Sequence, residues 1–162
     1  MGASTEATIQ TTIWVLNGPN LNLLGRRRPD VYGSVDLAGL EQRLTAHAQR
    51  RGLTAQCRQS NHEGQLIDWL HQANDDAGGV ILNAGAYTHS SIALHDAVEA
   101  IAIPVIEVHL SNIHAREPFR HTSLVAPQAL GVIAGFGVLG YELALDALAA
   151  HLSTPPTAAR SS

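Results

Sequence analysis

The sequence predicts an α/β domain, a doubly wound parallel sheet of five strands with helices on both faces. Two observations support this prediction. Short apolar runs alternate along the chain with longer segments whose apolar residues recur at helical spacing, and glycine or proline separates many of them. A strand followed by a helix and then another strand is typical of a parallel sheet with helices packed on it.

Five segments have the length and composition of strands. The first is a β-branched and apolar run that suits a strand buried on both faces. The second alternates apolar and polar residues, and Pro104 precedes the fourth, where a proline is tolerated. The predicted strands span residues 11–16, 53–59, 80–83, 105–110 and 131–134.

Four segments have helical periodicity. In the first, which Asp36 can begin, one stripe contains Leu37, Leu40, Leu44 and Ala48. We expect one catalytic domain over residues 11–152, with disordered tails at residues 1–10 and 153–162. The predicted helices span residues 36–51, 63–75, 90–100 and 138–152.

Composition limits the compartment and the partners. The chain has 162 residues and a formal net charge of -4, which argues against nucleic acid or an anionic membrane as the main partner. The single cysteine, Cys57, excludes an internal disulfide and fits a reducing compartment. The sequence contains neither a signal-peptide pattern nor an apolar run long enough to span a bilayer, so we expect a cytoplasmic protein with no membrane partner.

Lysine is absent, and all ten basic residues are arginine. A side-chain Schiff base, a pyridoxal phosphate attachment and a phosphate-loop lysine each need a primary amine on a flexible stem. The sequence therefore excludes lysine-dependent chemistry.

The segment Leu16–Gly33 (LNGPNLNLLGRRRPDVYG) has neither helical nor alternating periodicity. It is much longer than the usual connection of about 4 to 6 residues, and such loops are commonly active-site lids or disordered inserts. Because its leucines can pack on the domain, we interpret the segment as a lid.

Tyr32, near the end of this segment, is a candidate base. A phenol has an unperturbed pKa of about 10 and is a poor base at neutral pH, but a nearby guanidinium favours the phenolate. Arg26, Arg27 and Arg28 lie within reach along the loop. From this segment alone, a packed tyrosine beside a solvated charge cluster is the better interpretation.

Polar residues also follow the third and fourth predicted strands. In doubly wound sheets the ligand lies outside the carboxyl ends of the strands, so we expect these loops to share one crevice. Glu107 and His109 lie two apart on one strand, so the carboxylate can orient the imidazole, although a structural ion pair is the alternative. The segment Asn83–His89 precedes a predicted helix, and it is either an anion site or an ordinary turn with Thr88 or Ser90 as the helix cap.

Two further patterns could suggest a metal or a dinucleotide cofactor, but neither fits the known motif. His109, His114 and His121 lie close in sequence but match no metal motif, so we predict no metal site. The segment Gly135–Gly140 has the spacing GxGxxG, but too little chain follows for the strand and acidic residue of a dinucleotide site. We expect these glycines to permit close packing of a helix on the sheet.

Six segments of the chain form recognisable motifs: LNGPNLNLLG, RRPDVYG, SNHEGQLIDWLHQA, ILNAGAYTHSSIALHDA, IEVHLSNIHAREPFRHTS and GVIAGFGVLGYELAL. Together they resemble the type II 3-dehydroquinate dehydratases, the lysine-free dehydroquinases of the shikimate and quinate pathways. The resemblance implies a flavodoxin-like fold and dehydration of 3-dehydroquinate to 3-dehydroshikimate through an enolate, without Schiff base, metal or cofactor. It also implies a homo-oligomer in which trimers form a dodecamer.

The resemblance assigns roles to individual residues. Tyr32 would be the base, Arg27 would keep it ionised, and Asn20 would position a water against the enolate. His109, held by Glu107, would protonate the departing hydroxyl. Substrate binding would involve Asn83, His89, Leu110, Ser111, Arg120 and, from a neighbouring subunit, Asp96.

The chain departs from the family's usual residues at Arg28, Ala84, His95 and Pro118, which leaves open which of the three loop arginines acts on Tyr32. Two alternatives also stay open. One is a flavodoxin-like module that binds a flavin phosphate, although the loop after the first strand is not rich in serine and threonine. The other is a scaffold that keeps the fold without catalysis.

Overall fold

The computed structural model describes residues 9–155, which form one five-stranded parallel sheet with the strand order β2-β1-β3-β4-β5. The chain runs from β1 to β2 on one side and then returns to β3 on the other, so the order reverses between β1 and β3. The doubly wound parallel sheet predicted from the sequence is confirmed. The strands span Thr11–Asn17 (β1), Leu53–Gln59 (β2), Gly79–Asn83 (β3), Val105–His109 (β4) and Gly131–Ala134 (β5).

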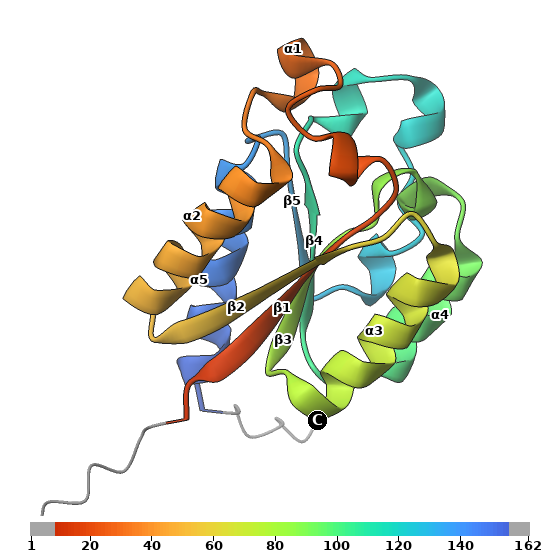
Figure 1. Ribbon diagram of the computed structural model, residues 1–162. Coiled ribbons are helices and arrows are strands. Elements are labelled where there is room, and N and C mark those ends of the chain that lie inside the picture. The colour runs from red at the N-terminus through yellow and green to blue at the C-terminus, as the bar shows by residue number, and fades with distance from the viewer. Residues whose placement is uncertain (1–8, 156–162) are drawn as a thin grey trace, which may run out of the picture.

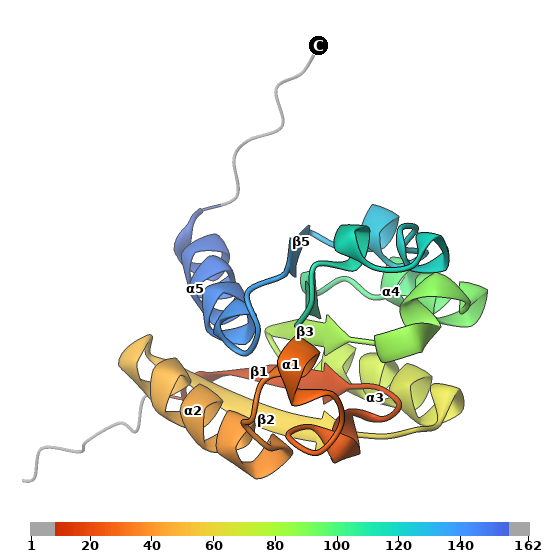
Figure 2. The same cartoon turned by 90° about the horizontal axis from the view of Figure 1, so that it is seen from above.

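Long helices cover both faces of the sheet (Figures 1 and 2). Helices α2 (Leu37–Arg50) and α5 (Leu139–Ser153) pack on one face. Helices α3 (Glu63–Asp76) and α4 (Ile92–Ala100) pack on the other. The sheet is therefore the middle layer of three.

Alternation along β1 supplies apolar side chains to both cores. Ile13 and Val15 join the core under α2 and α5, whereas Trp14 and Leu16 join the core under α3 and α4. Each of these four side chains is at most 4% exposed. Full burial of one large apolar side chain contributes about 1.5–3 kcal/mol, which explains why a continuous apolar run forms this strand.

Helix α4 begins later than the sequence pattern predicts. Its cap is Ser91, whose hydroxyl accepts a hydrogen bond from the Leu94 amide at 2.9 Å, so neither Thr88 nor Ser90 is the cap. The preceding residues Gly85–His89 form a 3-10 helix. The later start places Leu94 in the core, and this tertiary requirement selects between two adjacent serines.

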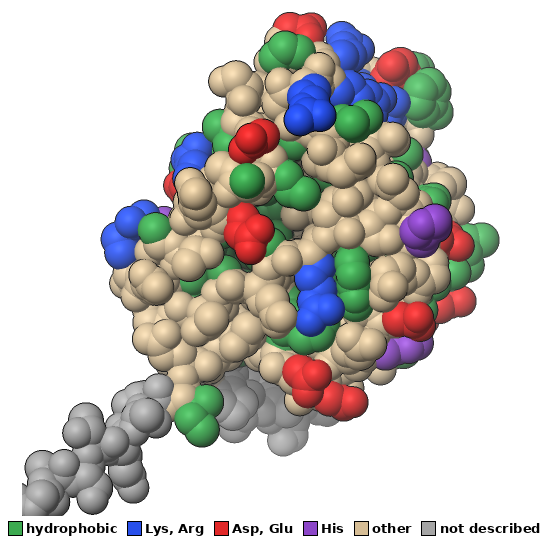
Figure 3. All heavy atoms as spheres, viewed as in Figure 1, with side chains coloured by type: hydrophobic (Ala, Val, Ile, Leu, Met, Phe, Trp, Pro, Cys, Tyr) green, Lys and Arg blue, Asp and Glu red, His purple; other side chains and the backbone are tan. Residues whose placement is uncertain are grey.

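The segment between β1 and α2 is more regular than its sequence suggests. It contains a 3-10 turn at Leu21–Leu23 and a one-turn helix α1 (Pro29–Tyr32). Leu24 is 5% exposed and packs in the core with α2, while α1 lies beyond the carboxyl ends of the strands (Figure 1). Basic side chains gather at this end of the molecule (Figure 3), where Arg26–Arg28 directly precede α1.

The glycines near the start of α5 serve different purposes. A Cβ atom on Gly140 would lie 3.5 Å from both Val108 and Ile133, which is an ordinary van der Waals contact, so the packing of α5 on the sheet does not require glycine here. Gly135 instead has a φ of +97°, which the turn after β5 requires and which other residues rarely adopt.

The first strand begins at Thr11 and the last helix ends at Ser153. The Asp36 side chain caps α2 as expected, and Ser153 is the last residue of α5. Most of the two predicted tails falls on residues 1–8 and 156–162, outside the described residues. Within residues 9–155, every helix is too short or too polar to cross a lipid bilayer.

Candidate active site

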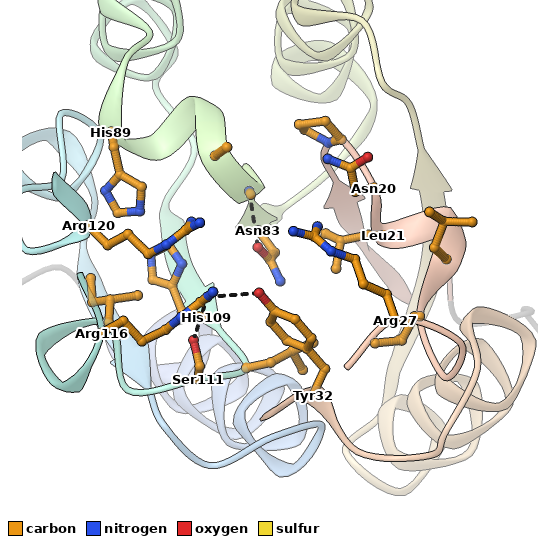
Figure 4. A pocket seen from close by; sticks show the side chains of 17 residues that line it. Asn20, Leu21, Arg27, Tyr32, Asn83, His89, His109, Ser111, Arg116 and Arg120 are labelled. Carbon is orange, nitrogen blue, oxygen red and sulfur yellow. Dashed lines mark hydrogen bonds between the residues drawn. The ribbon is translucent and has the colours of Figure 1, made fainter. Parts of the chain in front are cut away.

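A cavity of about 110 Å³ lies at the carboxyl ends of β1, β3 and β4 (Figure 4). The loops that follow these strands supply its walls, so the shared crevice expected from the sequence is present. It is lined by Pro19, Asn20, Leu21, Leu23, Leu24, Arg27, Tyr32, Asn83, Gly85, Ala86, His89, His109, Leu110, Ser111, Ile113, Arg116 and Arg120.

Two of these loops come together at Gly18. Its amide donates a hydrogen bond to the carbonyl of Asn83 at 2.8 Å. A Cβ atom at Gly18 would lie 2.5 Å from the carbonyl oxygen of Ala84, so only glycine permits this approach. The contact holds the loop after β1 against the loop after β3, and both loops supply residues to the cavity.

Asn83 ends β3 with its side chain held in one orientation. Its Nδ2 donates to the Tyr141 hydroxyl at 2.8 Å, and its Oδ1 accepts from the Gly85 amide at 3.2 Å. The Tyr141 hydroxyl in turn donates to Asn17 Oδ1 at 2.6 Å. Tyr141 is fully buried, and this burial raises the pKa of its phenol, so it stays neutral and keeps its donor hydrogen.

Tyr32 contacts an arginine that is distant in sequence. Arg116 Nη1 donates to the Tyr32 hydroxyl at 2.8 Å, and the Arg116 guanidinium carbon lies 5.4 Å from the ring centroid. Arg27, predicted for this role, also lines the cavity, but its guanidinium carbon lies 6.0 Å from the same centroid. Two guanidinium groups therefore lie near the phenol, and Arg116 makes the hydrogen bond.

Glu107 and His109 form the pair expected from their spacing on β4. His109 Nε2 lies 2.7 Å from Glu107 Oε1, and the two side chains are 6% and 1% exposed. Because Nε2 faces the carboxylate, Nδ1 is the ring nitrogen left for a ligand. The ring of His89 stacks on the ring of His109, with 6.2 Å between the two centroids, so both histidines belong to one side of the cavity.

Glu117 connects two arginines at the cavity rim. Its Oε2 accepts from Arg120 Nε at 2.8 Å and lies 3.8 Å from Arg116 Nε. A hydrogen bond from the backbone amide of Glu117 itself and then one from Arg120 lower the pKa of this carboxyl, so it is ionised at neutral pH. The carboxylate restrains both guanidinium groups beside the cavity.

Asn20 occupies an uncommon backbone conformation, with φ at +67°. Its amide donates to Asn61 Oδ1 at 3.0 Å, and the same oxygen accepts from Gln59 Nε2 at 3.1 Å. The carbonyl of Asn61 accepts from the Tyr87 hydroxyl at 2.8 Å. Residues from two other segments therefore fix the backbone that carries Asn20 at the cavity.

The charge of the cavity is opposite to that of the whole chain. Arg27, Arg116 and Arg120 line it together with two histidines, although the formal net charge of the chain is -4. Such a local concentration of guanidinium groups suits a small anionic ligand, because planar donors match a carboxylate.

A comparison with known protein families agrees with this geometry. Residues 11–149 match the family model described as Dehydroquinase class II. The chain belongs to this family. The match covers every strand and nearly all of α5, and therefore every residue predicted to act at the site.

Individual proteins are also similar to this chain in sequence or in fold. A 3-dehydroquinate dehydratase of Ruegeria pomeroyi is 62% identical over 88% of this chain and 96% of its own length. One of Halalkalibacterium halodurans is 61% identical over 85% of this chain and 94% of its own length. The crystal structure of type II dehydroquinase from Propionibacterium acnes superposes with a TM-score of 0.85 at 46% identity, covering 89% of this chain and 99% of that one.

The structure places most of the predicted site residues around one cavity. Asn20, Arg27, Tyr32, Asn83, His89, His109, Leu110, Ser111 and Arg120 line it, and Glu107 lies behind His109. Asp96 is exposed on α4 and does not line the cavity of its own chain, so its role beside a neighbouring subunit stays a prediction.

Sequence analysis named neither Arg116 nor Asn61 as a site residue. Arg116 lies 84 positions from Tyr32, whereas Arg27 is five positions away, and sequence distance alone favoured the nearer arginine. Arg116 lies in the matching segment IEVHLSNIHAREPFRHTS and Asn61 lies in SNHEGQLIDWLHQA, so the segments themselves were the available signal.

Neither a metal site nor a reactive thiol is evident among the described residues of the cavity. His114 and His121 have ring centroids 6.0 Å apart, but His109 is paired with Glu107 instead. Within residues 9–155, the one group of side chains close enough to share a metal ion is His95, Asp96 and Glu99 on α4, outside the cavity. Burial, reinforced by the charge of Glu41, raises the pKa of Cys57 to about 12, which leaves the thiol unreactive.

Proposed function

We propose that this chain dehydrates 3-dehydroquinate to 3-dehydroshikimate, as a lyase of the shikimate or quinate pathway. Membership of the class II dehydroquinase family and the names of its relatives support the proposal. The observation that carries it is the Tyr32–Arg116 hydrogen bond in the cavity that also contains the buried Glu107–His109 pair. This arrangement supplies a base and an acid to one ligand.

In the first step, the Tyr32 phenolate removes a proton from the carbon beside the ketone of the substrate. Arg116 supports this role because its Nη1 places a positive charge 2.8 Å from the phenol oxygen, with Arg27 adding a second positive charge nearby. The carbon–hydrogen electron pair moves into an enolate. Asn20 positions a water against the enolate oxygen and stabilises the developing charge.

In the second step, the enolate collapses and the carbon–hydroxyl bond breaks. His109 protonates the departing hydroxyl from Nδ1, and a water molecule leaves. The proton gained by Tyr32 equals the proton lost by His109, so one proton transfer between the two groups restores the starting state. The buried Glu107 supports this role because it stabilises the protonated imidazole.

The substrate carboxylate binds to Asn83 and to the backbone of Leu110 and Ser111. Asn83 supports this assignment because its amide is held by Tyr141 and Gly85, so little ordering is needed when the ligand binds. The ring hydroxyls are bound by His89 and Arg120, which line the opposite part of the cavity.

The proposed route forms no covalent intermediate and uses no metal or other cofactor. The absence of lysine from the chain supports the first part of this statement, because a side-chain Schiff base needs a primary amine. We also propose that the chain assembles into trimers that form a dodecamer, with Asp96 reaching the cavity of a neighbouring subunit.

The test is to mix the purified protein with 3-dehydroquinate and to follow the ultraviolet absorption of the conjugated product. The protein should generate this band, and Tyr32→Phe should abolish it at every pH while the fold is unchanged by circular dichroism. Borohydride added during turnover should leave the mass of the intact protein unchanged. An increase equal to trapped substrate would rule out the enolate route, and absence of the band with folded wild-type protein would rule out the proposed function.

A further inference from the structure

Ser123 lies behind the Glu107–His109 pair, outside the residues that line the cavity. Its hydroxyl oxygen is 2.6 Å from Glu107 Oε1. The same carboxylate oxygen is 2.7 Å from His109 Nε2. Because Glu107 is only 1% exposed, protein donors replace the water that would otherwise surround this carboxylate.

The direction of the Ser123 hydrogen is determined by its other contacts. Its oxygen accepts hydrogen bonds from the amides of Val125 at 3.2 Å and Ala126 at 3.0 Å. A serine hydroxyl has two acceptor sites and one hydrogen. Two backbone amides occupy the acceptor sites, so the hydrogen is donated to Glu107 Oε1.

The two carboxylate oxygens of Glu107 differ in their hydrogen bonds. Oε1 accepts from both Ser123 and His109, whereas Oε2 is buried and has no protein partner within the described part of the chain. Among the described residues, Ser123 and His109 are therefore the two hydrogen-bond partners that hold the carboxylate in its present rotation. Without Ser123, His109 alone would hold Oε1 by a hydrogen bond.

From this arrangement we infer that Ser123 is a positioning residue for His109 and acts through Glu107. It fixes Oε1, Oε1 holds Nε2, and Nδ1 is thereby directed to the cavity. The inference rests on the proposed role of His109 as the acid that protonates the leaving hydroxyl.

The segment around Ser123 is itself held in place by the loop after β3. The carbonyl of Thr122 lies 2.8 Å from His89 Nδ1, and the Leu124 amide donates to the carbonyl of Thr88 at 2.9 Å. Consecutive residues therefore contact both stacked histidines, His89 directly and His109 through Glu107. This connection makes the segment a rigid support for the acid side of the cavity.

The test compares Ser123→Ala with the wild type on two reactions, dehydration and exchange of the abstracted hydrogen with solvent. Tyr32 and Arg116 are untouched, so enolate formation and exchange should persist. We expect kcat for dehydration to fall about tenfold, part of the roughly 10²–10⁴-fold that a positioned general acid contributes. KM should change less than about twofold, so the ratio of exchange to dehydration should rise.

Two further variants separate loss of the Ser123 hydrogen bond from a general loss of structure. Ser123→Thr retains the hydroxyl and should recover most of the lost kcat, and Ser123→Cys, with a weaker donor, should give an intermediate ratio even if Ser123→Ala does not fold. Ser91→Ala is the matched control, because the Ser91 hydroxyl also accepts a hydrogen bond from a backbone amide, yet it does not contact Glu107. It should leave the ratio of exchange to dehydration unchanged.

A ratio that stays at the wild-type value in Ser123→Ala and Ser123→Cys would overturn the inference, as would an equal rise in Ser91→Ala. Either result, obtained with an active wild-type enzyme, leaves the proposed function intact. Failure of the wild type to dehydrate 3-dehydroquinate would instead count against the proposed function itself.

Discussion

The hydroxyl of Tyr32 has one charged hydrogen-bond donor within the described residues, Arg116. Arg27 approaches the same ring from another segment at a longer distance. A guanidinium that donates directly to a phenolate stabilises it more than one that only faces the ring, because the charge separation is shorter. We therefore predict that Arg116 contributes more than Arg27 to the proposed role of Tyr32 as the base.

Replacing these arginines separately should show the difference. In a profile of kcat/KM against pH, the ascending limb follows loss of the proton from the base. Loss of a nearby positive charge disfavours the phenolate, so Arg116→Ala should move this limb to higher pH by more than Arg27→Ala does. Each 1.4 kcal/mol of lost interaction corresponds to about one pH unit. Arg116→Lys should restore the wild-type position of the ascending limb only in part, since a compact ammonium lacks the planar donor fork.

Arg26→Ala is the control for these variants, because Arg26 is exposed and does not line the cavity. Its limb should coincide with that of the wild type. A larger displacement in Arg27→Ala than in Arg116→Ala would show that the loop arginine predicted from the sequence acts on Tyr32 after all.

At the scale of elements, helices α2 and α5 are joined by an ion-pair network on the surface. Asp146 Oδ1 lies 2.6 Å from Arg51 Nε and 2.7 Å from His47 Nε2, and the Asp146 side chain is 30% exposed. Partial desolvation opposes ionisation of Asp146, but the hydrogen bonds from Arg51 and then His47 outweigh it. The pKa of Asp146 is therefore lowered from its ordinary value of 3.8.

This shift predicts how stability depends on pH. A carboxyl whose pKa is lower in the folded state stabilises the fold above its unfolded value of 3.8, and this contribution disappears as pH falls through the folded value. Asp146→Asn should therefore lower the free energy of unfolding at pH 7 by about 0.2–1 kcal/mol, the range for partly exposed pairs. The difference from the wild type should shrink towards zero as pH falls below 3.8.

Urea unfolding at pH 7 and in acid, at one fixed protomer concentration, measures this difference. Asp75→Asn is the control, because Asp75 is an exposed aspartate of α3 with no ion pair within residues 9–155. A loss that is the same at both pH values, or the same in both variants, would show that the network does not stabilise the contact between α2 and α5.

The elements were predictable because their signals are local. The apolar run of β1 and the stripe of α2 follow directly from burial on both faces of a sheet, and Asp36 caps its helix as expected. The start of α4 was misplaced because Ser90 and Ser91 are equally good caps, and only the need to bury Leu94 distinguishes them.

The site was predictable to the extent that it depends on single segments. Glu107 and His109 share a strand, so their contact follows from a period of two. The contact of Tyr32 with Arg116 joins the loops after β1 and β4, and no local pattern encodes such a pair. The same holds for the link of Ser123 with Glu107, which depends on how the chain returns from β4 to β5.

For the whole molecule, the reversal of strand order determines where these loops meet. The chain leaves β1 for helix α2 on one face of the sheet and leaves β3 for helix α4 on the other, so the two loops diverge beyond their contact at Gly18 and leave a crevice at the carboxyl ends. The cavity lies there, and its three arginines concentrate positive charge in an otherwise acidic chain. The field that attracts an anionic substrate is therefore local rather than a property of the whole surface.

Asp96 connects this cavity to the proposed assembly. It is exposed on α4 and does not line the cavity of its own chain, so any part it takes in catalysis must be supplied to another subunit. If so, each site combines Tyr32 of one chain with Asp96 of its neighbour, and Asp96→Ala should lose most activity although every group of its own cavity is intact.

Mixing two weakly active variants tests this directly. Tyr32→Phe and Asp96→Ala, dissociated together in equal amounts and reassembled, should form hybrid oligomers in which some sites join an intact Tyr32 to an intact Asp96. With random assembly into closed rings, about a quarter of the sites are complete, so activity should rise to about a quarter of the wild-type value. A mixture of Tyr32→Phe with His109→Ala should show no such gain, because both residues line the cavity of one chain. Every site in such a hybrid lacks either Tyr32 or His109, whichever subunits lie next to each other. Activity equal to the mean of the two parent variants in the first mixture, with reassembled oligomers seen by light scattering, would show that Asp96 does not complete a neighbour's site.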